Sequence, residues 1–542
     1  MQATHARLAP LASTLLATLA PAAFADGEIL SATVIDDTQG GLGAVLSEWD
    51  IFGYSVDCIG DLDGDGNADL VVGAPGNDLG FQTNEGAVWI VFLHADGTVK
   101  TREKLLSYTP HAEVGLSVAS LGDVDGDGNT DVLVGSYLGG ARIYYLQPDG
   151  TSNWNYTMSS APSGSPNYYG YGVGAAGDID GDGVPDALVG APDTSWGSPE
   201  RLYVLFMNSS GTIKSSTEIG PGVGGFLGAV GIKEGFGWSA TGLGDLNGDG
   251  IGDVAVSTPY DDGDGSLWIL YLEIDGTVKH EVRIQSPEAT GGFGVDLKGA
   301  GDLDGNGVQD LIVGCASGDV YLLFLAADGS LRTYLRYEES DLLTTTGMGV
   351  GRGVATMPDL DGNGSRELIV GLPYADTGGL NHGGIEILAW EGVSMASYSP
   401  LGCQLNPAGS LVPSGPPILG STVSFQLDNP LGSQSPGSLS FLALSTTSAT
   451  GGGSCGLPLP GYHMNPSQPT GELLVAPPFD LSILGTLWAP GAPAEVQLTI
   501  PYDPALLGLE LAVQGAIVDP TGGASGSSVF GLTRGLNLRI GT

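Results

Sequence analysis

One loop sequence recurs six times between residues 60 and 370, and each copy runs directly into a short apolar segment. In chain order, as loops 1 to 6, the copies read GDLDGDGNADLVVGAP from Gly60, GDVDGDGNTDVLVGS from Gly122, GDIDGDGVPDALVGAP from Gly177, GDLNGDGIGDVAVSTP from Gly244, GDLDGNGVQDLIVG from Gly301 and PDLDGNGSRELIVGLP from Pro358. A repeat of this kind limits the fold to an array of similar units.

The loops have the composition of a cage for a hard cation. Positions 1, 3, 5 and 9 carry Asp, Asn or Glu, and the Gly at position 6 lets the backbone turn sharply and point its oxygens inward. Calcium takes six to eight oxygen ligands at about 2.3–2.6 Å. The predicted ligands, with position 7 included, are Asp61, Asp63, Asp65, Asn67, Asp69, Asp123, Asp125, Asp127, Asn129, Asp131, Asp178, Asp180, Asp182, Val184, Asp186, Asp245, Asn247, Asp249, Ile251, Asp253, Asp302, Asp304, Asn306, Val308, Asp310, Asp359, Asp361, Asn363, Ser365 and Glu367. The sequence therefore predicts about six Ca²⁺ ions, one in each loop.

An EF-hand is excluded, because its loop closes with a bidentate Glu at position 12. Here position 12 is valine in every copy: Val72, Val134, Val189, Val256, Val313 and Val370. Position 9 must close the site instead, and a β-branched strand follows, not a helix. The alternative is an Asp/Gly turn that only caps a hairpin, and loop 6, with Asn363 and Glu367, departs most from the pattern.

The charge balance limits the partners. Lys and Arg number 17 against 61 Asp and Glu, which gives a formal net charge of −44. Such a field repels phosphate backbones and anionic membranes, so nucleic acid is not expected as a partner. Although 91 of the 542 residues are Gly, 42% are hydrophobic, which indicates a folded, turn-rich β protein. A chain of this length predicts two domains.

The first 25 residues read as a secretory signal peptide. Arg7 precedes an apolar run from Leu8 to Ala20, and Ala23-Phe24-Ala25 is a small-residue cleavage site. The run is shorter than the roughly 20 apolar residues of a membrane anchor. We therefore expect a secreted or cell-surface protein with no membrane span in the mature chain.

The repeat unit predicts a β-propeller over residues 26–392. The first ligands lie about 60 residues apart, at 61, 123, 178, 245, 302 and 359, and each unit reads as four strands. The last unit lacks its fourth strand, whereas Ile29–Ile35 resembles the fourth strands of the other units. If this strand joins the last unit, the ring closes without a free edge. Six blades are predicted, or seven if residues 37–50 and 391–400 form another.

These motifs resemble the FG-GAP repeats of integrin α-subunit propellers. The similar residues are the FG openings, the GAP closings and the D-x-D-G-D-G-x-x-D loops; the clearest copies are Phe52-Gly53, Phe236-Gly237, Phe293-Gly294, Gly73-Ala74-Pro75 and Gly190-Ala191-Pro192. The resemblance implies calcium in the loops and a role in adhesion or ligand recognition. Integrin propellers differ in having seven blades and a membrane helix. The copies at Val114-Gly115 and Met348-Gly349 lack the aromatic residue.

After residue 392 the loops stop and the composition changes. Residues 393–400 read as a linker, and residues 401–542 alternate short apolar runs with Pro/Gly turns, which predicts a small β-sandwich. This part resembles a C-terminal domain common in secreted planctomycete proteins. A Cys403–Cys455 disulfide is expected there, whereas Cys58 and Cys315 are expected to be free thiols in blade strands.

No motif in the chain points to catalysis. The six His share no metal-ligand spacing, and neither a GxSxG elbow nor a phosphate-binding glycine loop occurs. We therefore predict a non-enzymatic module that binds an extracellular protein or glycan. A polysaccharide-active enzyme and a purely structural surface protein are the alternatives, because the many paired carboxylates leave a glycosidase or lyase site open.

Strand alternation predicts which face binds. In a four-stranded meander the calcium loops and the Asp-Gly turns share one end of the ring. Longer, aromatic-rich connections lie at the opposite end, where recognition is expected. The aromatic candidates are Phe81, Tyr168, Tyr169, Trp196, Tyr260 and Tyr374.

Overall fold

The structure, a computed structural model, describes most of the chain from residue 27 onward. Up to residue 392 the described part excludes 1–26, 79–83, 107–110, 139, 159–160, 162–167, 193–198 and 343–347; beyond it, 394–396, 402–409, 415–416, 418–420, 430–435, 446–456, 461–469, 476–480, 501–505, 507–508, 520–529 and 542. The predicted signal peptide, Phe81, Trp196, Cys403 and Cys455 therefore lie outside the described residues. The chain divides into two compact units, one from Glu28 to Gly392 and the other containing Val393 to Thr542.

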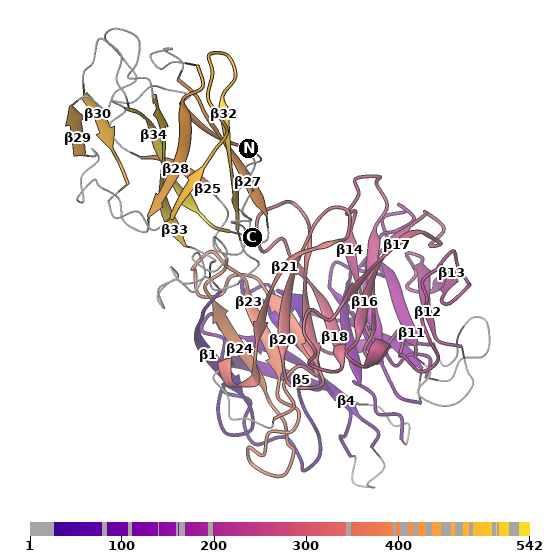
Figure 1. Ribbon diagram of the computed structural model, residues 1–542. Coiled ribbons are helices and arrows are strands. Elements are labelled where there is room, and N and C mark those ends of the chain that lie inside the picture. The colour runs from indigo at the N-terminus through magenta and orange to yellow at the C-terminus, as the bar shows by residue number, and fades with distance from the viewer. Residues whose placement is uncertain are drawn as a thin grey trace. The chain divides into compact units, whose positions relative to one another are not determined.

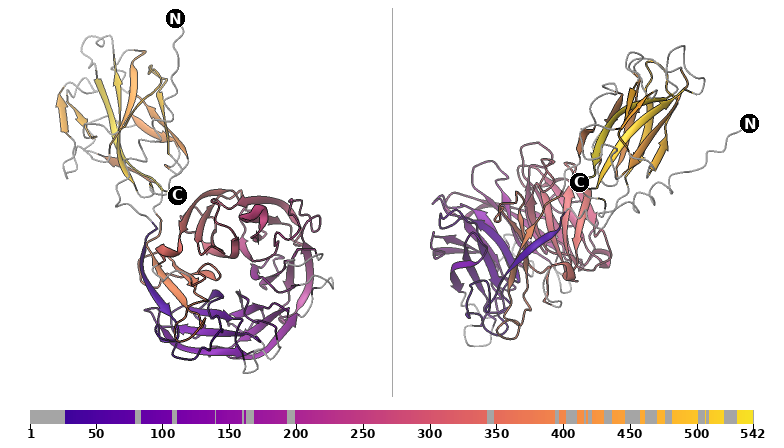
Figure 2. Two further views of the ribbon diagram at one scale, coloured as in Figure 1. Left: turned by 60° about the horizontal axis from the view of Figure 1, so that its bottom comes forward. Right: turned by 90° about the vertical axis from the view of Figure 1, so that its left-hand side faces the viewer.

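The first unit consists of four-stranded antiparallel sheets set around one axis (Figure 2, left). Five of them use consecutive strands in the order of the chain. They are β2 (Ser55–Gly60), β3 (Asp69–Ala74), β4 (Ala87–Leu93) and β5 (Val99–Leu106); β6 (Ser117–Gly122), β7 (Asp131–Gly135), β8 (Ala141–Leu146) and β9 (Ser152–Met158); β10 (Val173–Gly177), β11 (Asp186–Ala191), β12 (Arg201–Met207) and β13 (Ile213–Ile219); β14 (Ala240–Gly244), β15 (Asp253–Thr258), β16 (Ser266–Leu272) and β17 (Val278–Gln285); and β18 (Phe293–Gly301), β19 (Asp310–Cys315), β20 (Val320–Leu325) and β21 (Leu331–Tyr337).

A sixth sheet closes the ring with the N-terminal strand. Its order is β1-β24-β23-β22, with β22 (Val354–Met357), β23 (Glu367–Gly371), β24 (Ile385–Trp390) and β1 (Ile29–Ile35). β1 pairs antiparallel with β24, from Ile29 opposite Trp390 to Ile35 opposite Ile385. The prediction that the N-terminal strand completes the last blade is confirmed.

The first strands of the sheets contact one another in a closed cycle, β2 to β6, β10, β14, β18, β22 and back to β2. Residues 37–50 contain no strand, and β25 (Ser397–Leu401) pairs with β34 (Phe530–Arg539) of the second unit. Within the described residues, these two segments therefore form no further sheet of the ring. The propeller predicted from the repeats is the observed fold.

Glycine pairs let neighbouring sheets approach closely. A β-carbon at Gly73 would lie 1.9 Å from the carbonyl oxygen of Gly115 in the next sheet, and one at Gly371 would lie 1.8 Å from that of Gly53 across the closure. No other residue fits in such a gap. The FG and GAP glycines are thus the contact points between blades.

The residue before each FG glycine fills the core between blades. Phe52, Phe236 and Phe293 are fully buried there. In the third and sixth blades this place is taken by Tyr169 and Val350. The sixth motif is therefore Val350-Gly351 and not Met348-Gly349 as predicted, because the carbonyl oxygen of Gly351 is the one that would meet a β-carbon at Gly314, at 1.9 Å.

The apolar core lies between adjacent sheets, and the third strands supply much of it. All seven residues of β4 are buried, as are those of β16. One cluster joins the first and last blades through Phe52, Trp89, Ile369 and Ile385. The four strands predicted for each repeat unit correspond in the first blade to β2, β3, β4 and β5.

Loops 1 to 6 join the first and second strands of each blade, at what we call the loop end of the ring. The tight turns between third and fourth strands lie at this end too. A β-carbon at Gly97, in the turn after β4, would lie 3.3 Å from the Leu360 side chain in loop 6. The predicted division into two faces is confirmed.

The second unit is a pair of packed antiparallel sheets (Figure 1). Its strands are β25, β34, β33 (Glu510–Val518), β28 (Leu439–Ser445) and β31 (Leu481–Leu484) in one sheet; β26 (Leu411–Ser414), β27 (Thr422–Leu427) and β32 (Ala494–Thr499) in the second; and β29 (Leu457–Pro460) with β30 (Thr470–Leu473) as a separate pair. β27 contacts β33 and β28 contacts β32, so the two larger sheets face each other as the predicted sandwich does. Trp488 is fully buried, and its Nε1 donates to Asp428 at 2.9 Å.

The only helices in the described part of the chain are two short 3₁₀ turns, η1 (Asp261–Gly263) and η2 (Glu339–Asp341). No helix of the described residues has the length and apolar character needed to cross a membrane. Cys58 and Cys315 are free, as predicted, and burial raises the pKa of their thiols to about 11 and about 12.

Candidate metal centres and axial pocket

The carboxylate at position 1 holds each loop in shape. In loop 1, Asp61 accepts the backbone N–H of Asp65 at 2.9 Å and of Gly66 at 2.8 Å. The N–H of position 6 makes the same bond to position 1 in loops 2 to 6, at 2.7–2.9 Å. Gly66 has φ 94°, in the left-handed region, which explains the Gly at position 6.

The residue at position 9 is buried and ties the loop to the blade. Asp69 accepts the N–H of Leu62 at 3.0 Å and of Leu93, at the end of the third strand, at 3.1 Å. Burial raises the pKa of Asp69 to about 6 and that of Asp131 to about 7. A buried carboxylate with a raised pKa favours a bound cation, because the cation offsets the cost of its charge.

Five loops gather three carboxylates, each offering one oxygen within 4.8 Å of the other two. Loops 1, 3, 5 and 6 use positions 1, 3 and 9, whereas loop 2 uses positions 1, 3 and 5: Asp61, Asp63, Asp69; Asp178, Asp180, Asp186; Asp302, Asp304, Asp310; Asp359, Asp361, Glu367; and Asp123, Asp125, Asp127. Loop 4, with Asn247 at position 3, forms no such cluster within the described residues.

The side chain at position 5 accepts the backbone N–H of position 7. The N–H of Asn67 donates to Asp65 at 2.9 Å, and the same contact recurs in all six loops. The side-chain amide of Asn67 also donates to Asp65, at 2.8 Å. Position 5 in loops 5 and 6 is Asn306 and Asn363, and each amide nitrogen donates to a backbone carbonyl at 3.0 Å.

Four loops are contacted by a basic side chain from the fourth strand of their blade, a feature that sequence reasoning missed. Lys100 Nζ lies 2.8 Å from Asp63 Oδ2 and also contacts Asp65; Lys214 Nζ lies 2.6 Å from Asp180 Oδ2 and also contacts Asp182. Lys279 pairs with Asp249 at 3.0 Å, and Arg332 pairs with Asp304. Hydrogen bonding to Lys100 holds the pKa of Asp65 below its usual value. The signal available in the sequence was a basic residue at one fixed place in four of the fourth strands.

Two carboxylate oxygens in these loops have no protein partner. Asp63 Oδ1 and Asp180 Oδ1 are buried and accept no hydrogen bond. Asp63 and Asp180 belong to the clusters of loops 1 and 3, together with Asp61 and Asp178. A buried acceptor without a donor is costly, and a hard cation with oxygen ligands would satisfy it. The donor set therefore fits calcium.

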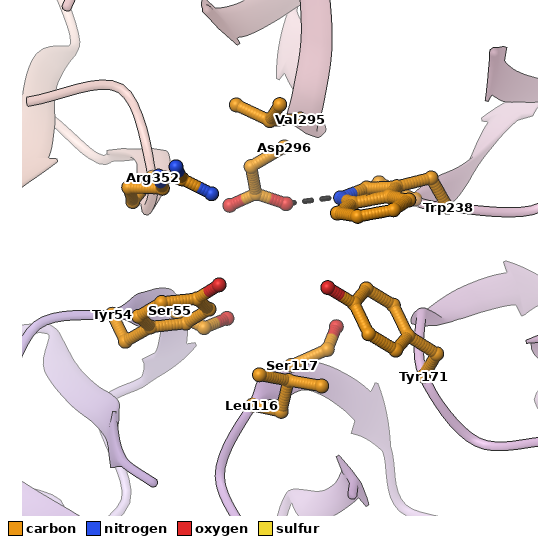
Figure 3. Close-up of a pocket in the computed structure, with 10 residues that line it drawn as sticks. Tyr54, Ser55, Leu116, Ser117, Tyr171, Trp238, Val295, Asp296 and Arg352 are labelled. Carbon is orange, nitrogen blue, oxygen red and sulfur yellow. Dashed lines mark hydrogen bonds between the residues drawn. The ribbon is translucent and has the colours of Figure 1, made fainter. Parts of the chain in front are cut away.

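At the opposite end of the ring, six equivalent residues meet around the axis (Figure 3). Each follows an FG glycine: Tyr54, Leu116, Tyr171, Trp238, Val295 and Arg352. With Ser55, Ser117, Ser239 and Asp296 they line a pocket with an enclosed volume of about 20 Å³, room for about one water molecule. We call this the axial pocket. Its residues were missed because successive ones are 55 to 67 positions apart in the sequence and only ring closure brings them together.

The axial pocket combines a buried carboxylate with a cation. Asp296 accepts N–H groups from Val354 at 3.1 Å and Leu297 at 3.0 Å, and the Ser239 hydroxyl at 3.1 Å. Burial raises its pKa to about 6. Figure 3 shows the Tyr54 and Tyr171 hydroxyls and the Arg352 guanidinium directed toward the same space as Asp296. Arg352 has no ion-pair partner within 4.0 Å in the described part of the chain.

A buried lysine crosses the axis beneath this pocket. Lys298 of β18 donates to the carbonyl of Val118 in β6 at 2.5 Å, and lies 3.5 Å from Asp57 of β2. Its side chain is only 6% exposed. The side chain links three blades at the axis.

The aromatic residues predicted for recognition divide into three groups. Tyr260 and Tyr374 are exposed, by 46% and 36%. Tyr168 is half-buried against Tyr137 and Tyr171. The prediction is wrong for Tyr169, which is 5% exposed in the core because it occupies the FG aromatic position of its blade. Tyr260 packs edge-on against Trp238 of the axial pocket, with ring centroids 5.2 Å apart.

Family models for FG-GAP repeats match three stretches of the chain. The FG-GAP repeat model covers residues 52–91, and the FG-GAP-like repeat model covers residues 123–189 and 245–313. The chain therefore contains FG-GAP repeats in these three stretches. The matches include loops 1 to 5 and their following strands, so the resemblance predicted from the sequence is confirmed for the propeller.

Curated relatives of this chain include integrin α-subunits. It is 34% identical over 227 residues to integrin alpha-PS2 of Drosophila melanogaster, which is 38% of this chain and 15% of that protein. Against integrin alpha-IIb of Mus musculus the identity is 33% over 275 residues, 45% of this chain and 25% of that protein. The matches thus span a quarter or less of these relatives' length.

A solved structure, the crystal structure of BBS1N in complex with ARL6DN, soaked with mercury, matches this chain over 74% of its length and over 94% of the length of the solved chain. The identity is 14% and the TM-score 0.36. That similarity is too low to add to the assignment.

Proposed function

We propose that this protein is a secreted or cell-surface adhesion module, in which calcium in the loops stabilises a propeller that binds an extracellular protein or glycan. The observation that carries the proposal is the convergence of three carboxylates in five loops. The buried, unpartnered oxygens of Asp63 and Asp180 support a cation in two of them.

Calcium would be held by the loop carboxylates and would supply a positive charge at the loop end. The carboxylates at positions 1 and 9 already bind the loop backbone and the end of the third strand. An ion held between them would link the first, second and third strands of a blade. Such an ion would have a structural role. The hydrogen bonds within the loop already occupy many of the other carboxylate lone pairs, so few of them are free to bind an external ligand.

The ligand would bind at the opposite end. The axial-pocket residues lie at the start of the first strands, and the exposed Tyr260 and Tyr374 lie in connections between the second and third strands of their blades, on a scaffold of closely packed sheets. Aromatic and Arg side chains provide most of the binding energy in many interfaces. The resemblance to integrin α-subunits supports adhesion as the role of this end.

The test is a binding screen of the full mature chain against immobilised extracellular-matrix proteins and glycans. It is run once with about 2 mM calcium, enough to fill sites of the affinity typical of extracellular modules, and once with chelator. We expect one defined component to retain the protein in calcium, and we expect this binding to be lost when chelator is added. Release of a cleaved glycan product without retention would contradict the proposal and favour the polysaccharide-active enzyme. Failure to retain any component would favour a structural surface protein.

A further inference from the structure

The basic residues that contact the loops occupy the same strand position in four of the blades. Four fourth strands have Lys or Arg as their second residue: Lys100 in β5, Lys214 in β13, Lys279 in β17 and Arg332 in β21. The equivalent residues are Asn153 in β9 and Leu30 in β1. All four basic side chains pair with position 3 or position 5 of the loop in their own blade.

Loops 1 and 2 form a natural pair for comparison. Both have Asp at positions 1, 3, 5 and 9 and Asn at position 7. In loop 1 the ammonium of Lys100 contacts the carboxylates at positions 3 and 5. In loop 2 a neutral amide replaces it, since Gln147 Nε2 donates to Asp127 at 3.2 Å.

The difference in charge is reflected in the clusters. In loop 2 the position 5 carboxylate joins positions 1 and 3 in the cluster, whereas in loops 1 and 3, where a lysine contacts it, position 5 is absent from the cluster and position 9 takes its place. Lys100 and Lys214 therefore form ion pairs with carboxylates that are predicted calcium ligands. The oxygens Asp63 Oδ1 and Asp180 Oδ1 remain without a partner, so each lysine occupies only part of the ligand set.

We propose that these four basic residues are tethered counter-cations that weaken divalent-ion binding in their own loops, so that loop 2 binds calcium most tightly. The inference rests on the proposed calcium function. A unit positive charge roughly 5 Å from a divalent ion lowers affinity by about tenfold even in water-like surroundings. Loops 4 and 5, with three carboxylates and a basic residue each, bind most weakly. The stepwise affinities let the propeller respond to calcium over a wide concentration range.

The test is calcium titration by isothermal calorimetry on the full mature chain. Lys100→Met removes the charge and keeps the length of the side chain, and it tightens one site by about tenfold. Lys214→Met does the same in loop 3, which provides an independent variant should the first fail to fold. Arg102→Met is the matched control, because Arg102 lies on the same strand two residues further and forms no ion pair with the loop in the described residues; its titration matches wild type.

The double variant Lys100→Met/Asp61→Asn locates the effect, since the gain must disappear when position 1 of loop 1 is disabled. Unchanged or weaker calcium binding in both lysine variants, with wild type binding calcium, overturns the inference and makes the lysines positioning residues. If wild type binds no calcium at all, the proposed function fails as well, and the titration distinguishes this from failure of the inference alone.

Discussion

The two ends of the propeller are built from equivalent positions, yet they differ in how much the blades vary. At the loop end, the position 1 carboxylate binds the position 6 N–H in all six blades, and the buried position 9 carboxylate recurs with little change. At the axial pocket, the six residues after the FG glycines are Tyr, Leu, Tyr, Trp, Val and Arg. A feature repeated in every blade serves the ring, whereas a feature that differs in each blade can form a single asymmetric site on the axis.

Both ends of the propeller are formed only when the ring of blades is closed, so opening the ring should disrupt both. Deleting residues 28–35 removes β1 and exposes the edge of β24, so we expect the largest effect of any change: loss of the cooperative transition and aggregation. Circular dichroism and size-exclusion chromatography measure it. As a control, Leu30→Ser, which changes a side chain 52% exposed on the same strand, leaves the protein monodisperse. A soluble deletion variant with wild-type melting would show that β1 does not close the ring.

A buried acid in the third strand of the last blade gives the next largest expected effect on stability. Glu386 in β24 is fully buried, neither carboxylate oxygen has a hydrogen-bond partner, and burial raises its pKa from 4.5 to about 8. The unfolded chain releases this proton first, so the stability contribution of the protonated Glu386 is fully present below about pH 4.5, falls as the pH rises, and is lost above about pH 8. At pH 7 the penalty is roughly 3 kcal/mol.

Glu386→Gln is therefore expected to stabilise the protein at pH 7 and to flatten the pH dependence of unfolding by denaturant. Glu391→Gln, at an exposed residue just beyond the same strand, is the matched control and leaves the profile unchanged. A variant with the wild-type pH profile would show that Glu386 is ionised in the folded protein at neutral pH.

A smaller effect separates the two ends directly. Arg352→Ala and Tyr374→Ala are expected to weaken binding of the component retained in the screen by about tenfold or more at saturating calcium, as is common for aromatic and Arg anchors. Their melting temperatures change little, because neither side chain fills the core between blades. Ile274→Ala, an exposed residue at the loop end, leaves affinity unchanged. If only loop-end changes weaken binding at saturating calcium, the roles of the ends are reversed.

Much of the fold could be predicted because its signals are local. The loop ligands alternate within nine residues, and strands β27 and β4 coincide with short apolar runs, Thr422–Leu427 and Val88–Leu93. The N-terminal strand was also predictable, since one blade lacked a strand and the chain had one to spare. The resemblance to the planctomycete domain and the Cys403–Cys455 disulfide stay predictions.

The features that sequence reasoning missed depend on pairing between distant residues. Lys100 meets Asp63 across 37 positions, and only the register of the blade shows that its side chain reaches the loop. The axial residues look like ordinary turn residues until the ring brings them together. Tyr169 looked exposed because its neighbours are polar, whereas the position before an FG glycine is buried in every described blade.

Thermal melting of the mature chain in excess calcium and in chelator tests the central claim most directly, namely that the loop end holds ions that stabilise the ring. Ligands that bind only the folded state add stability by mass action, about 2.7 kcal/mol for each site at 100 times its Kd. For several sites in a protein of this size we expect the midpoint to rise by about 10 °C or more with calcium. An unchanged midpoint would contradict the claim and leave the loops as hairpin turns without a metal.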